Sequence, residues 1–252
     1  GLVGSEMCIR DRVKVEIRVR DEDDLLGKVL LTGFHGVGYV GWITVRHLVK
    51  SLKARRIGFV YSPYMTPYVS MGEGIVTPYE LYAADNLVMF VPNVPLSSRE
   101  ITALPMKLAE YAVSKGVSEA ILIGGLDSRL EDKRYRVKYA ATSAYLKSKQ
   151  KVVEKLDLGR IEEYLYKVGP LAVMLSIFET LDFPALTLLP YANIARPDPR
   201  AAAEAIKVLN NLLGLNVGVE ELLRDEEQIE EEIKELEERI KRSGMESKML
   251  YV

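Results

Sequence analysis

Cysteine is nearly absent from this chain, and histidine is scarce. The one cysteine, Cys8, lies in the opening segment Gly1–Arg12, which has neither the apolar core of a signal peptide nor helical amphipathicity. We expect residues 1–12 to be a non-native leader and exclude them from the fold. From Val13 onward no disulfide, no cysteine-based zinc site and no thiol nucleophile is then available. With only His35 and His47 present, a metal site built from several histidines is also excluded.

Long hydrophobic runs and a strong net charge are missing too. No apolar run reaches about 18 residues, so the sequence predicts no membrane-spanning helix. The formal net charge is −2 and the sequence pI is near 5.9. Binding to nucleic acid in general requires a basic surface that neutralises phosphates, which this balance does not favour. We therefore expect a cytoplasmic protein that binds neither nucleic acid nor membrane.

The chain has enough apolar residues for a large core. Hydrophobic residues make up 48% of its 252 residues, and strand-like segments alternate with helical ones over residues 13–216. The predicted strands are Val13–Val19, Lys28–Thr32, Arg56–Tyr61, Asn86–Val91, Val117–Ile123, Tyr135–Ala140 and Ala185–Leu189. The predicted helices are Val40–Lys53, Ser98–Ser114, Gly169–Leu181 and Arg200–Leu213. This alternation predicts a three-layer, Rossmann-like α/β domain with a mainly parallel sheet.

An antiparallel hairpin is expected at one side of that sheet. The segments Tyr68–Met71 and Ile75–Thr77 have strand character, and Gly72-Glu73-Gly74 between them is a turn signal.

The part of the chain after the α/β body is acidic. Between Val219 and Arg242 eleven acidic residues stand against five basic ones, a net charge of −6, which leaves a mildly basic body. Apolar residues recur through this segment at heptad-like spacing: Leu222, Ile229, Ile233, Leu236 and Ile240. We predict a charged helix over residues 217–242 whose acidic face is solvated. Its apolar seam needs a partner, which is either its own body or a second protomer.

A glycine-rich turn follows the second predicted strand. Gly36-Val-Gly38-Tyr-Val-Gly41 fits the G-x-G-x-x-G pattern, in which a dinucleotide pyrophosphate sits on a helix N-terminus. The acidic residue that would bind the ribose is missing, because no Asp or Glu follows the next strand until Glu73. The glycines also suit a tight turn with close helix–sheet packing. A nucleotide- or small-anion-binding enzyme is therefore an alternative hypothesis.

Other candidate groups have ordinary structural explanations. We expect His35 to be a loop donor or an interface residue rather than a catalytic base. Asp127 and Arg129 follow a strand end, where they form either an anion site or, more simply, a local salt bridge. Five tyrosines are candidates for an oligomer contact or for ordinary core packing: Tyr61, Tyr64, Tyr68, Tyr79 and Tyr82. No residue is assigned a catalytic, cofactor-binding or metal-binding role.

The last ten residues, 243–252, are predicted to be a flexible tail that ends Leu250-Tyr251-Val252. This ending combines an apolar anchor, an aromatic ring with a hydroxyl group and a terminal carboxylate. A lysine or a nest of backbone N–H groups on a partner can bind such a carboxylate. The tripeptide is therefore the candidate partner-binding site.

Taken in order, these motifs resemble the archaeal proteasome assembly chaperone family. The matching pieces are the turn Gly33–Gly41, the Val91-Pro-Asn-Val-Pro95 segment, the Gly124-Gly125 strand end, the Arg196-Pro-Asp-Pro-Arg200 helix start and the Leu250-Tyr251-Val252 ending. At Gly125-Leu-Asp127 the chain departs from typical members, in which proline more often follows. The resemblance covers residues 13–252.

The resemblance implies a Rossmann-like domain without known catalytic residues or cofactors, which assembles into homo-oligomers. It also implies that the C-terminal hydrophobic-tyrosine-any tripeptide enters pockets between α-subunits of the proteasome core particle. There, the carboxylate of Val252 would meet a lysine and Tyr251 would fill the groove. A third hypothesis is a self-assembling protein in which the 217–242 helix pairs protomers.

Overall fold

The structure is a computed structural model. It describes residues 14–20, 25–72, 74–131, 134–162, 168–224 and 226–242. The predicted leader and the predicted tail, with Leu250, Tyr251 and Val252, lie outside these residues. Among the residues described, no helix combines the length and the apolarity that crossing a bilayer requires.

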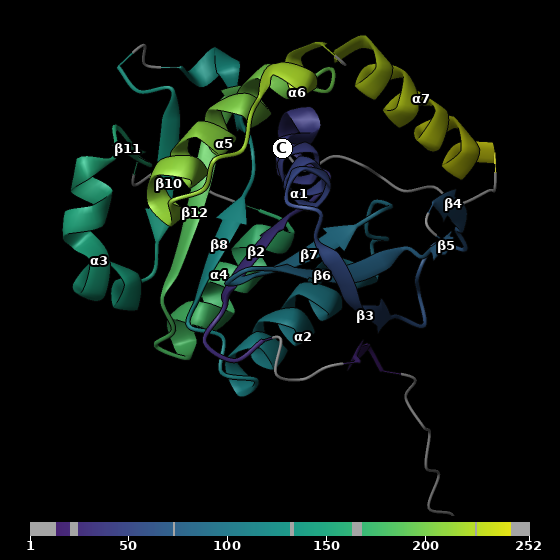
Figure 1. The fold of residues 1–252 in the computed structure, drawn as a ribbon, viewed down its shortest axis with the longest axis horizontal. Helices are drawn as coiled ribbons and strands as arrows, with labels where there is room; N and C mark the ends of the chain where they lie inside the picture. Colours follow the sequence, from purple (N-terminus) through teal and green to yellow (C-terminus); the bar gives the residue numbers. More distant parts are fainter. Residues whose placement is uncertain are drawn as a thin grey trace, which may run out of the picture.

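A ten-stranded mixed sheet forms the middle layer of the described chain (Figure 1). Its four central strands run parallel in the order β7 (Leu87–Pro92), β2 (Val29–Gly33), β8 (Glu119–Ile123) and β12 (Ala185–Ala192). Nearly every residue of these strands is buried. Continuous apolar runs of this kind are typical of parallel strands covered on both faces.

Antiparallel strands extend the sheet on both sides. Beyond β7 lie β6 (Tyr79–Ala84), β3 (Arg55–Tyr61) and β1 (Glu16–Val19). Beyond β12 lie β10 (Val137–Ala141), which is antiparallel to β12, and β11 (Gly159–Arg160). A further short strand, β9 (Leu126–Asp127), pairs with the end of β12. The antiparallel part is thus wider than the single hairpin that the sequence predicts.

Helices cover both faces of the sheet, which confirms the predicted three-layer α/β class. One face packs against α1 (Val40–Ser51) and α5 (Pro199–Leu213), together with α3 (Ser143–Lys155). The other face packs against α2 (Glu100–Ser114) and α4 (Pro170–Thr180). Pro105 lies inside α2 without ending it.

The predicted hairpin is present as β4 (Ser70–Gly72) and β5 (Gly74–Val76). Among the described residues these two strands pair only with each other, apart from the main sheet. The described residues also include the short 3₁₀ turns η2 (Val37–Tyr39) before α1 and η3 (Ser128–Leu130) after β9.

In the acidic C-terminal segment, where the sequence predicts a helix over residues 217–242, the described residues form α6 (Glu220–Arg224) and α7 (Glu226–Arg242). Apolar residues of both helices pack on the body of the chain. Leu222 of α6 is 3% exposed and packs into the core beside α5. In α7, Ile233 packs into that same core cluster, whereas Leu236 contacts the cluster on the other face of the sheet.

Candidate functional site

The acidic helix α7 is attached to its own body by its apolar seam. Ile233 and Ile240 are 3% and 6% exposed, and Ile229 packs beside Ile233. The body of the same chain therefore covers the apolar seam of α7. This answers, within one chain, the question of which surface covers the predicted seam.

Polar contacts flank that apolar row. Glu232 pairs with Arg46 of α1 at 2.8 Å, and Glu230 pairs with Arg196 before α5 at 3.1 Å. The hydroxyl of Tyr39 donates to Glu237. Burial, strengthened by this bond to the carboxylate, raises the pKa of Tyr39 above its ordinary range. The acidic appendage and the mildly basic body thus attract each other across this contact.

The glycine-rich turn connects β2 to α1. A methyl group on Gly41 would lie 2.3 Å from the carbonyl oxygen of Ile123, and one on Gly33 would lie 2.4 Å from Cα of Gly41. Gly38 has φ of +59° and leaves no room either, because its methyl group would meet Cβ of Ala192 at 2.7 Å. These glycines allow the turn, the sheet and the β12–α5 loop to approach one another closely.

A phosphate group fits poorly at this turn. The loop before α5 occupies the adjacent space, where the backbone N–H of Asp198 donates to the carbonyl of Gly38 at 2.8 Å. The Asp198 carboxylate accepts from the backbone N–H groups of Ala201 and Asn193, at 3.0 and 2.9 Å, and so caps α5. A bound phosphate would face this negative charge. The packing contacts account for the glycines without a nucleotide.

His35 is buried between aromatic rings, and the prediction that it is a loop donor is wrong. Its ring lies 5.7 Å from that of Tyr39 and 5.2 Å from that of Trp42, and neither ring nitrogen has a hydrogen-bond partner in the described structure. Burial, together with the charge of Arg46, lowers the pKa of His35 to about 3. The imidazole is therefore neutral at physiological pH. His47, in contrast, contacts the carbonyl oxygen of Gly218 through Nε2 at 2.8 Å and so links α1 to the segment before α6.

Asp127 and Arg129 form the local salt bridge that is the simpler of the two predictions. The guanidinium contacts the Asp127 carboxylate at 2.5 Å, and the Arg129 backbone N–H donates to the same group at 2.9 Å. These hydrogen bonds lower the pKa of Asp127. In the described part of the chain, no group of three or more His, Cys, Asp or Glu side chains is arranged to hold a metal ion.

The tyrosine-rich stretch divides into buried and exposed residues. Tyr79 is fully buried, and its hydroxyl donates to Glu100 at 2.9 Å. Tyr68 packs against the core cluster on the face of α2 and α4. Tyr61 and Tyr64 are 42% and 46% exposed. Tyr79 thus belongs to the core, whereas Tyr61 and Tyr64 are exposed, and a role for them in an oligomer contact stays a prediction.

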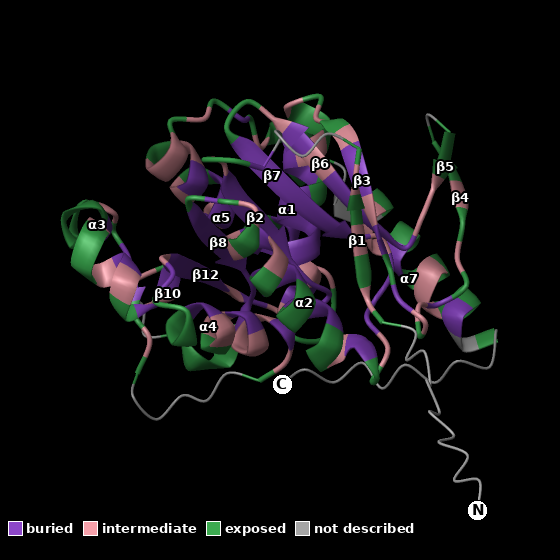
Figure 2. Cartoon of the chain, turned by 90° about the horizontal axis from the view of Figure 1, so that it is seen from below, coloured by how far each residue is buried: buried purple, intermediate pink, exposed green. Residues whose placement is uncertain are grey.

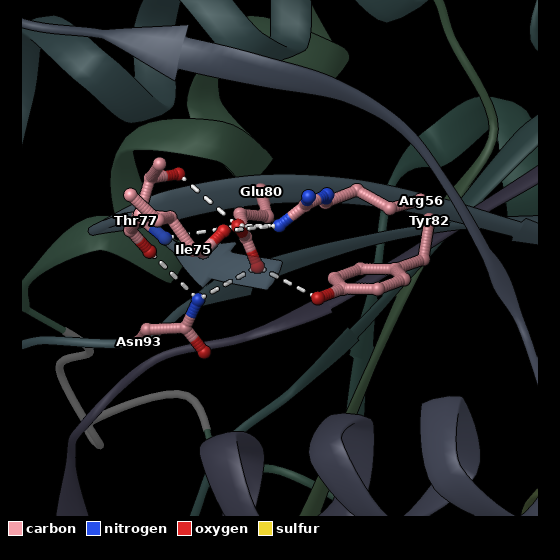
Figure 3. Close-up of polar contacts among 6 residues, drawn as sticks. All are labelled: Arg56, Ile75, Thr77, Glu80, Tyr82 and Asn93. Atoms are coloured by element: carbon pink, nitrogen blue, oxygen red, sulfur yellow. Dashed lines mark hydrogen bonds and ion pairs between the residues drawn. The ribbon is translucent and has the colours of Figure 1, made fainter. Parts of the chain in front are cut away.

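Sequence reasoning missed the buried carboxylate of Glu80, which organises the hairpin base (Figure 3). One oxygen of Glu80 accepts from Arg56 at 2.8 Å and from the backbone N–H of Thr77 at 2.9 Å. The other accepts from the Tyr82 hydroxyl at 2.6 Å and the Asn93 amide at 3.1 Å. The Arg56 guanidinium also donates to the carbonyl of Ile75 at 2.6 Å. These hydrogen bonds around the Glu80 carboxylate, which we call the hub, connect the hairpin to β3 and β6.

The aromatic residues Tyr79 and Tyr82, which favour β structure, were the signal that could have revealed this strand, but nothing in its pattern indicated that Glu80 is buried. The predicted partner-binding residues Leu250, Tyr251 and Val252 lie outside the described residues, so the structure does not place them. Within the described chain, the features nearest to them in sequence are α7 and its contacts with the body.

Comparison with known proteins identifies the family. The model of the PAC2 family matches residues 30–237, and the chain belongs to that family. Its fold is similar to that of Pyrococcus furiosus PbaA, described as an archaeal homolog of proteasome-assembly chaperone. The two share 26% identity with a TM-score of 0.80, over 91% of this chain and 99% of PbaA. The resemblance inferred from the ordered motifs is confirmed.

Two further relatives cover most of the chain. Pyrococcus furiosus PbaB, described as an archaeal proteasome activator, has the same fold with a TM-score of 0.72 at 22% identity. That match covers 89% of this chain and 99% of PbaB. The uncharacterized protein MJ0106 of Methanocaldococcus jannaschii is 26% identical over 212 residues, which is 83% of this chain and 85% of that protein.

Proposed function

We propose that this PAC2-family protein is a chaperone-like factor of the proteasome core particle and that it works by binding, without catalysis. Its last three residues, Leu250, Tyr251 and Val252, dock into pockets of the α-subunits. Through this contact it promotes assembly of the α-ring or binds the assembled ring.

The similarity to PbaA carries this proposal, because it extends over nearly the whole of both chains and PbaA is described as a homologue of a proteasome-assembly chaperone. The chemistry of the tripeptide adds support. Leu250 supplies an apolar anchor, Tyr251 an aromatic ring with a hydroxyl donor, and Val252 a carboxylate for a cationic pocket.

One tripeptide is a weak ligand, since ordering a chain segment costs conformational entropy. We infer that the protein forms a homo-oligomer, so that several tails act together. Once one tail is bound, the others bind at a high effective concentration, which increases the avidity without any new contact. The docked α7 helps, because it fixes the point on the body from which each tail departs.

A pull-down with core-particle α-subunits tests the proposal. Deleting Leu250–Val252, or replacing the terminal carboxylate by an amide, should abolish binding while sedimentation shows an unchanged oligomer. The matched control is Glu246→Ala with Lys248→Ala, which alters the same segment but keeps the tripeptide and the net charge. Equal binding by the intact and the truncated protein would rule the proposal out.

A further inference from the structure

The β4–β5 hairpin presents apolar side chains to solvent on one face. Met71 and Ile75 are directly paired across the hairpin, and Val69 lies two residues before Met71, on the same face. These three residues, the hairpin patch, are 80%, 53% and 71% exposed. Figure 2 shows the hairpin standing at the edge of the molecule with little of it buried.

Specific hydrogen bonds anchor the base of this hairpin. A two-stranded hairpin with three residues in each strand is marginally stable by itself. Here, the Arg56 guanidinium binds the carbonyl of Ile75, and the buried Glu80 carboxylate binds both Arg56 and Thr77 at the hairpin base. The buried Glu80 carboxylate and Arg56 thus anchor the base of a hairpin whose apolar face is exposed among the described residues.

The C-terminal end of α7 lies on the same side of the molecule as this hairpin, near it in Figure 1 and separated from it in the view of Figure 2. Leu236 of α7 packs against the same core cluster as Met65 and Tyr68, which belong to the segment leading to the hairpin. The chain continues for ten residues beyond Arg242, and a fully extended chain of that length reaches about 33 Å. The hairpin therefore lies within reach of the final residues of the same chain.

Those residues have the composition of a strand. Met249-Leu250-Tyr251-Val252 are all apolar or aromatic, and tyrosine and valine favour β structure. Among the described residues, β4 and β5 each have one unpaired edge. An added strand would satisfy the backbone groups of one edge and make a three-stranded sheet, which is the smallest kind that is stable in water.

We propose that the hairpin patch is the resting site of Met249–Val252 of the same chain, which bind it as a third strand. This inference rests on the proposed function, because it concerns the same tripeptide. A tail bound to the hairpin is withheld from an α-subunit pocket, so the two sites compete. The hairpin then sets what fraction of the tails is available for binding.

The first test removes the patch and measures affinity for isolated α-subunits. Met71→Ser with Ile75→Thr should tighten binding by about threefold to tenfold, as expected when two thirds to nine tenths of the tails are withheld. The matched control is Leu130→Ser, an exposed leucine of η3 at 52% exposure outside the hairpin. Thermal melting establishes that both variants are folded. Affinity that is unchanged, or weakened, in the folded patch variant would overturn the proposal.

The second test does not depend on the proteasome. Deleting Met249–Val252 should increase the amide hydrogen exchange of Ser70–Val76 at least severalfold, with β6 unchanged. If the deletion speeds amide exchange in the hairpin but the intact protein binds no α-subunit, the resting site stands and the proposed function fails. If tail-dependent binding is found and the hairpin exchange is unchanged, the function stands and the resting site is overturned. A protection that grows with protein concentration would assign the site to the tail of a second copy and overturn the intramolecular proposal.

Discussion

The glycine-rich turn and the β4–β5 hairpin differ in how they are packed. In the turn, Gly33, Gly38 and Gly41 are in contact with backbone or core atoms, so that even a methyl group has no space. In the hairpin, large apolar side chains have no cover among the described residues, and a polar hub holds the strands in place. The more conspicuous sequence motif therefore serves the scaffold, whereas the less conspicuous one presents a surface.

The turn should be the more sensitive region, and Gly41→Ala is expected to have the largest effect. Its methyl group would lie 2.3 Å from the Ile123 carbonyl oxygen, which the backbone of β8 holds in place. We expect a loss of about 3 kcal/mol or more in the free energy of unfolding, measured by denaturant titration. Gly36→Ala is the matched control. Its φ is −127° and nothing lies within 4 Å of the added methyl group, so its stability should change little. Equal effects would show that the turn is not close-packed as described.

The hairpin hub should come next. Glu80→Gln replaces one acceptor oxygen by an amide that faces donors from Arg56, Thr77, Tyr82 or Asn93. Because the side chain is fully buried, we expect a loss of about 2–4 kcal/mol and faster amide exchange in the hairpin. Glu235→Gln, which breaks an exposed pair with Arg239 on α7, is the control and should leave the melting temperature unchanged. A hub variant as stable as wild type would mean that the hairpin does not depend on Glu80.

The pH dependence of stability tests the burial of His35 between the rings of Tyr39 and Trp42. His35 has a pKa of about 3 in the folded protein and about 6.5 when unfolded. Between these values the unfolded chain binds the additional proton, so stability is lost as pH falls below about 6.5, by up to about 1.4 kcal/mol per pH unit. His35→Phe, which keeps a ring between Tyr39 and Trp42, should flatten this slope between pH 4 and 6. Parallel slopes in urea titrations of the variant and the wild type would contradict the assignment.

The smallest effect is expected at the contact between α7 and the body. Arg46 and Glu232 are about half exposed, so Glu232→Gln should cost less than about 1 kcal/mol, and high salt should reduce the difference further. Ile233→Ala is the informative comparison, because that side chain is 3% exposed and should cost about 2 kcal/mol or more. If the charge substitution were the more damaging of the two, electrostatic attraction rather than the apolar seam would hold α7 in place.

The sequence predicted most of the parallel core, because apolar runs such as Ile121–Ile123 have few alternatives to a buried strand. It did not predict β6, since Glu80 interrupts the apolar pattern and a charged residue usually indicates an exposed position. Helix α3 was missed for a related reason. Of its residues only Tyr145 and Val153 are buried, which is too narrow an apolar stripe to recognise.

For the site, the sequence predicted that a heptad-like seam exists but not which surface covers it. That depends on Arg46, Arg196 and Tyr39, which are distant in sequence and come together only in the fold. The hairpin followed from its glycine turn, but the exposure of Met71 and Ile75 did not, because alternation does not say which face of an isolated hairpin meets solvent. The role of Leu250, Tyr251 and Val252 stays a prediction.

Position 39 has to meet two requirements, one on its backbone conformation and one on its side chain. Its φ of +54° is a backbone conformation that favours glycine or asparagine, yet its hydroxyl is the group that reaches Glu237 on α7. Glycine would relieve the backbone and lose the attachment, and asparagine would fit the backbone but is too short to reach. Phenylalanine would keep the strain and give up the hydrogen bond. Residue choice at position 39 is therefore a compromise between local backbone energy and long-range attachment, and no common substitution improves both.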